Sequence, residues 1–126
     1  MIFTLKELHY TYTIKNTEPI ICCPGALYRY LGQTVSYIKL IILHNTNIST
    51  ENVQIYNVPG NGEGGVGIIS NSSLTNNKMY DIDLAPDETR ILEFKQPLVL
   101  SSHYDSIQAI ATTANKVTVY IEGAIE

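Results

Sequence analysis

Residues 78–94 read KMYDIDLAPDETRILEF and contain two short segments separated by a turn. In the first segment every second residue is apolar (Tyr80, Ile82 and Leu84), and two aspartates lie between them. The same alternation resumes in 89–94, after the Ala-Pro-Asp sequence. A side-chain period of two predicts half-buried β-strands, and the Pro-Asp step predicts the turn that joins them.

Further runs of this kind occur on both sides of residues 78–94. They cover residues 8–14, 20–23, 36–44, 52–58, 107–111 and 117–125. Short strands separated by turn-forming residues favour antiparallel pairing, and therefore a sandwich or a barrel. We predict an all-β fold, namely a single antiparallel β-sandwich that is jelly-roll-like, with residues 36–58 forming a hairpin.

Length and composition restrict the class of protein. The chain has 126 residues, of which 44% are hydrophobic and 16% charged, so one globular domain is expected. Its net charge of −4 leaves no basic surplus for a phosphate backbone, so we predict no nucleic-acid partner. The longest apolar run is short and no signal peptide is evident, so we predict no membrane association.

No motif for catalysis or cofactor binding has its required context. Residues 60–65 match G-x-G-x-x-G, but the segment after them is a poor helix. Asp81 and Asp83 share one strand face, which is usual for a solvated face. The adjacent Cys22 and Cys23 are expected to be reduced thiols. We therefore predict no enzyme activity and no catalytic, cofactor-binding or metal-binding residues.

The segment 36–44 is apolar on both faces. Ile38, Leu40 and Ile42 fall on one face by strict alternation, whereas Tyr37, Ile41 and Leu43 fall on the other. A strand of this kind is either central or covered by a partner on its outer face. We therefore predict that its second face lies at an interface.

Several segments together resemble the small β-sandwich structural proteins of tailed bacteriophages. They are YIKLIILHN (37–45), MYDIDLAPDET (79–89), LVL (98–100), DSI (105–107), ANKVTV (114–119) and EGAIE (122–126). The resemblance covers roughly residues 27–126, and its entry motif is degraded. It implies a non-enzymatic virion protein of the head, collar or tail that is made in the host cytoplasm. Other virion proteins and further copies of the chain are the implied partners.

Residues 1–26 lie outside this resemblance. We expect them to form an N-terminal strand and arm that pairs with a neighbouring subunit, while 27–126 form the sandwich domain. The candidate interface residues are Leu8, Tyr10, Tyr12, Ile14, Tyr37, Ile41 and Leu43.

Two other functions stay open. The first is a carbohydrate-binding module of a tail fibre or host-recognition apparatus, which would bind a host glycan with tyrosines and the glycine-rich residues 59–77. The second is a small hydrolase using His103 or the pair Asp81 and Asp83. Neither has a motif as extensive as the phage resemblance.

Overall fold

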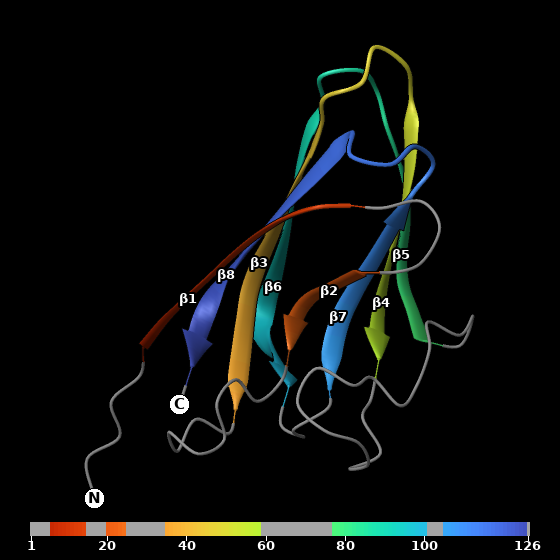
Figure 1. The fold of residues 1–126 in the computed structure, drawn as a ribbon. Coiled ribbons are helices and arrows are strands. Elements are labelled where there is room, and N and C mark those ends of the chain that lie inside the picture. The colour runs from red at the N-terminus through yellow and green to blue at the C-terminus, as the bar shows by residue number, and fades with distance from the viewer. Residues whose placement is uncertain (1–5, 15–19, 25–34, 59–76, 101–104, 126) are drawn as a thin grey trace, which may run out of the picture.

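The computed structural model describes residues 6–14, 20–24, 35–58, 77–100 and 105–125, which form two antiparallel sheets packed face to face (Figure 1). The predicted all-β sandwich is therefore confirmed. Its strands are β1 (Lys6–Thr13), β2 (Ile20–Pro24), β3 (Ser36–Asn45), β4 (Glu51–Val58), β5 (Lys78–Leu84), β6 (Thr89–Leu100), β7 (Ser106–Ala111) and β8 (Val117–Ile125).

The strand order is that of a jelly roll. Sheet A has the order β1-β8-β3-β6, and sheet B has the order β2-β7-β4-β5. The pairs β1–β8, β2–β7, β3–β6 and β4–β5 are those of a single antiparallel ribbon folded back on itself. Rolling such a ribbon into two sheets gives the eight-stranded jelly roll.

Two predictions about connectivity are wrong. Residues 36–58 do not form a hairpin, because β3 belongs to sheet A and β4 to sheet B. The N-terminal strand does not lie outside the sandwich, because β1 pairs with β8 from Lys6 opposite Ile125 to Thr13 opposite Thr118. β8 therefore pairs with β3 along one edge and with β1 along the other.

The core lies between the sheets and follows the predicted alternation. Leu84, Val119 and Ile121 are fully buried or nearly so. The other inward-facing apolar residues within 78–94 are partly buried and pack against the core. The buried cluster consists of Ile14, Ile38, Ile41, Leu43, Val53, Ile55, Leu84, Leu100, Ile107, Ala109, Ala111, Val117, Val119 and Ile121. Met79, Tyr80, Ile82, Leu92, Phe94 and Leu98 pack at its border.

A β-bulge in β3 changes which residues face this core. Against β8, the register of β3 shifts between Ile38 and Leu40 so that Lys39 is an extra residue. Against β6, the extra residues are on the partner strand, because residues 94–97 lie opposite Lys39. Ile38 is buried before the bulge, and Ile41 and Leu43 are buried after it. An extra residue reverses the alternation of all residues that follow.

Gly123 in β8 lies against this bulge. A Cβ at Gly123 would overlap the carbonyl oxygen of Tyr37 and lie 3.1 Å from Cα of Ile38. These are backbone atoms of the neighbouring strand, which cannot move aside as a flexible side chain can. Only glycine therefore allows β8 and β3 to approach this closely.

We expect Gly123→Ala to lower the free energy of unfolding by about 1–3 kcal/mol or more, because the added methyl group must displace β3. Urea unfolding followed by circular dichroism measures the change. Thr118→Ala is the matched control, since Thr118 lies in the same strand and is partly exposed. Equal stabilities for the two variants would contradict this explanation of Gly123.

Candidate interaction face and its surroundings

The outer face of sheet A has a contiguous group of apolar side chains, called here the apolar stripe. Its members are Tyr37, Leu40 and Ile42 of β3, Ile91 and Val99 of β6, and Tyr120 of β8. Ile42 is opposite Ile91 on one side and Tyr120 on the other, and Tyr37 is opposite Val99. Ile91 is 55% exposed and Val99 47% exposed, so the stripe is open to solvent.

Polar residues flank the stripe. Leu40 lies between Tyr37 and Ile42 along β3 and is opposite Glu93 in β6 and Glu122 in β8, so this middle row has a carboxylate on each side. Beyond Ile42, Nδ1 of His44 lies 2.7 Å from the Thr89 hydroxyl oxygen. An apolar centre with a polar rim is the usual composition of a protein–protein interface.

The structure places the predicted interface residues differently from the prediction. Ile14, Ile41 and Leu43 are fully buried in the core of their own chain, so their assignment to an interface is wrong. The bulge at Lys39 explains the error for Ile41 and Leu43, because it turns them inward. Tyr37 does lie on the outer face. The side chains of Leu8, Tyr10 and Tyr12 lie outside the described part of the structure.

Most of the stripe lies outside the predicted interface residues. Strict alternation places Leu40 and Ile42 on the same face as the buried Ile38, and Val99 is not among the predicted interface residues. The sequence does contain a sign of the stripe at Ile91. This residue is apolar at a position in 89–94 where the alternation predicts a solvent-facing polar residue.

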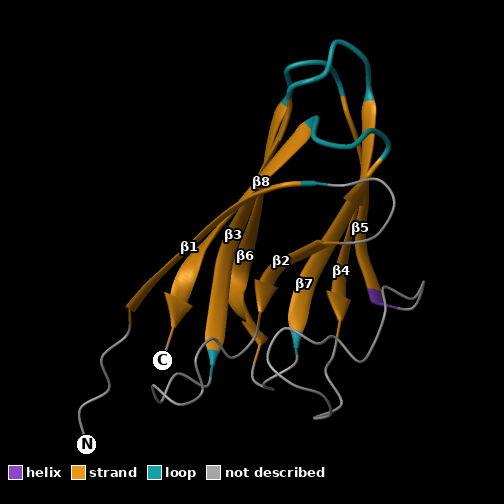
Figure 2. Cartoon of the chain, in the orientation of Figure 1, coloured by secondary structure: helices purple, strands orange, loops and turns teal. Residues whose placement is uncertain are grey.

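The β3–β4, β5–β6 and β7–β8 connections lie at the same end of the sandwich (Figure 2). Two buried polar side chains, Asn45 and Glu51, join them. Nδ2 of Asn45 donates hydrogen bonds to the carbonyl oxygens of Ser49, at 3.0 Å, and Leu84, at 3.1 Å. Glu51 accepts hydrogen bonds at 2.8 Å from both the backbone N–H and the hydroxyl group of Thr113. The β3–β4, β5–β6 and β7–β8 connections are therefore bonded to one another through side chains.

The turn between β5 and β6 has the features of a type II turn. Pro86 is at its second position, Asp87 has a positive φ of 63°, and the Glu88 N–H donates to the Ala85 carbonyl at 3.0 Å. The Glu88 carboxylate accepts hydrogen bonds from the Ala85 N–H, at 2.9 Å, and from Arg90, at 2.6 Å. The Ala85 N–H, followed by Arg90, holds the pKa of Glu88 below its ordinary value.

The outer face of sheet B is polar where Asn52 and Asp81 meet. Nδ2 of Asn52 donates hydrogen bonds to Asp81, at 2.7 Å, and to Asp83, at 3.0 Å. The bond from Asn52, and then the Lys78 ammonium group at 3.4 Å, hold the pKa of Asp81 below its ordinary value. The two aspartates therefore share an amide donor.

The remaining candidate residues from the sequence are buried or lie outside the described residues. Tyr56, one of the tyrosines considered for sugar binding, is only 6% exposed and donates to Gln54 at 2.6 Å. Residues 59–76, which contain the G-x-G-x-x-G sequence, and His103 lie outside the described residues. Among the described residues, no group of three His, Cys, Asp or Glu side chains could hold a metal ion. The same part of the chain forms no helix that is long and apolar enough to cross a membrane.

Comparison with known proteins finds distant similarity among solved structures. No protein-family model matches the sequence. No curated protein matches it either. Among solved structures, a chain described as "nora virus structure" is similar, with a TM-score of 0.37 and 12% sequence identity. The match covers 99% of this chain and 60% of that chain, so this chain spans less than two thirds of its length.

The perturbed pKa of Glu88 predicts a pH dependence of stability. A carboxylate whose folded-state pKa is lowered stabilises the fold above its ordinary pKa of 4.5, and this contribution is lost as the pH falls through the lowered value. We expect the wild type to be more stable than Glu88→Gln at pH 7, and the difference to vanish in acid. Thermal unfolding of both proteins across this pH range measures it.

Arg90→Gln removes one of the two causes of the shift and should show a smaller loss of stability with the same pH dependence. A stability difference between wild type and Glu88→Gln that is constant from neutral to acidic pH would show that the charge of Glu88 has no such effect.

Proposed function

We propose that this chain is a non-enzymatic structural protein of a virus particle, of the tailed-phage kind, and that it binds other virion proteins through the apolar stripe. The observation that supports this most is the position of Ile42, Ile91 and Tyr120 in one cross-strand row on the outside of sheet A. Contiguous apolar patches of large extent are rare on soluble monomers and mark interaction sites.

The fold is compatible with this role. Jelly rolls of two Greek keys are found in viral capsid domains, and also in lectins and cupins, so the fold by itself selects no function. The phage assignment rests on the similarity of residues 79–89 and of the segments that follow to phage β-sandwich proteins. A net charge of −4 favours protein contacts over contacts with packaged nucleic acid.

Such an interface gains most of its energy from a few apolar side chains at its centre. Ile91, in the edge strand β6, is opposite Ile42 and is the most exposed residue of the stripe, so it is the member most available to a partner. Contact with a partner surface would remove its side chain from water. A carboxylate at the same position would instead be buried without a counter-charge.

We expect Ile91→Asp to abolish incorporation of the chain into virus particles while leaving its folded state intact. The chain and its variants are tagged, made in the host together with the particle, and quantified by mass spectrometry after density purification. Gln96→Asp is the matched control, because it adds the same charge to an exposed position of β6 outside the stripe.

Wild-type chain that is absent from purified particles would overturn the virion proposal itself. Wild-type chain that is present, together with an Ile91→Asp variant incorporated equally well, would instead overturn only the assignment of the stripe.

A second candidate function is carbohydrate binding on the outer face of sheet B. Asp81 and Asp83 are exposed there and are held side by side by Asn52, and such carboxylates can accept hydrogen bonds from sugar hydroxyl groups. A glycan array measures binding directly. Binding that is lost in Asp83→Ala but kept in Glu93→Ala, on the opposite sheet, would favour this function over the first.

A further inference from the structure

Ile48 is the most exposed large apolar side chain among the described residues. It lies in the connection between β3 and β4 and is 95% exposed. Single apolar residues on a surface are common, but this one lies at the end of the sandwich where side-chain hydrogen bonds join several connections. Its neighbours on both sides take part in those bonds.

The backbone around Ile48 is fixed by side chains. Oδ1 of Asn45 accepts a hydrogen bond from the Asn47 N–H at 2.8 Å, and Nδ2 of Asn45 donates to the Ser49 carbonyl at 3.0 Å. Oδ1 of Asn47 accepts a hydrogen bond from the Ile48 N–H at 2.8 Å, and its Nδ2 donates to Glu51 at 3.1 Å. A loop ordered before it binds loses little conformational entropy on binding.

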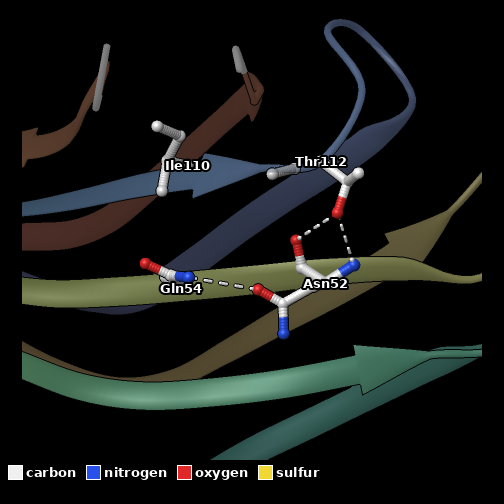
Figure 3. A pocket seen from close by; sticks show the side chains of 5 residues that line it. Asn52, Gln54, Ile110 and Thr112 are labelled. Atoms are coloured by element: carbon white, nitrogen blue, oxygen red, sulfur yellow. Dashed lines mark hydrogen bonds between the residues drawn. The ribbon is translucent and has the colours of Figure 1, made fainter. Parts of the chain in front are cut away.

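A hollow on the outer face of sheet B offers a complementary site. It has a volume of about 170 Å³ and is lined by Asn52, Gln54, Ile110, Ala111 and Thr112 (Figure 3). For scale, a cavity of about 150 Å³ can hold a benzene molecule, so four side-chain carbon atoms fit in this volume. Ile110 supplies an apolar side chain to the lining, whereas Ala111 is buried in the core behind it.

The polar atoms of the hollow already have partners within their own chain. Gln54 Nε2 donates to Asn52 Oδ1 at 3.3 Å, and Asn52 Nδ2 donates to Asp81 at 2.7 Å. The Thr112 hydroxyl oxygen accepts from the Asn52 N–H at 3.0 Å. An apolar occupant therefore leaves these groups hydrogen-bonded, whereas unpaired polar groups would make its binding costly.

We propose that Ile48 of one copy inserts into this hollow on a second copy of the same chain. An exposed apolar side chain and a surface pocket on one molecule are the two halves of a contact between copies. Ile48 precedes β4 and Asn52 lies at the start of β4, so both halves are at the same end of the sandwich. A two-fold dimer then makes the contact twice in one interface.

The inference rests on the proposed assembly role and identifies one contact within it. It leaves the apolar stripe free, because the stripe is on sheet A and the hollow is on sheet B. The chain could then bind a different virion protein and a second copy of itself simultaneously.

Sedimentation velocity over a range of concentrations tests the contact. We expect a reversible dimer for the wild type, and dimer dissociation constants about tenfold or more higher for Ile48→Ser, which loses burial of an isoleucine in two symmetric places. Ile110→Asp places a charge in the hollow and should have the same effect. Gln96→Ser is the control, because Gln96 is exposed on sheet A outside the stripe and its loss should leave the dimer unchanged.

A photo-crosslinking residue at position 48 tests the location of the contact. When isotope-labelled and unlabelled chains are mixed, we expect inter-copy crosslinks to peptides that contain residues 52–54 or 110–112. A wild type that stays monomeric, a dimer insensitive to Ile48→Ser, or crosslinks confined to other segments would overturn the inference. Chain present in purified particles in any of these cases would leave the virion proposal standing.

Discussion

The close backbone contact between Gly123 and the bulge at Lys39 determines how sheet A faces its surroundings. β3 is hydrogen-bonded on both edges, to β8 and to β6, and the bulge at Lys39 shifts its register against β8. Ile41 and Leu43 therefore complete the core, while Leu40 and Ile42 face outward. Without the extra residue the strand would present the opposite set of side chains, and the apolar stripe would have a different composition.

The end of the sandwich near Asn45 and Glu51 is organised by polar rather than apolar contacts. Both side chains are buried, and both have hydrogen-bonding partners in other connections. Burying a carboxylate and an amide is costly unless their hydrogen bonds are made, so such groups specify one arrangement of the loops. The three connections are therefore held to one another by hydrogen bonds, and Ile48 lies in one of them.

The sequence was sufficient to predict strands and an all-β sandwich, because the side-chain period of two is a local property of each segment. The alternation of Tyr80, Ile82 and Leu84 is present in the structure as predicted. The assignment of each strand to a sheet depends on long-range pairing, so residues 36–58 were wrongly predicted as a hairpin. The bulge was missed because Lys39 and Gly123, which together form it, are 84 positions apart in sequence.

The place of β8 in sheet A also has a consequence for synthesis. β8 pairs with both β1 and β3, so the edges of these two strands that β8 covers stay unpaired until residues 117–125 have been translated. While the ribosome is still adding residues, these edges can pair wrongly with other chains. The many long-range pairings of this jelly roll also make its folding slow.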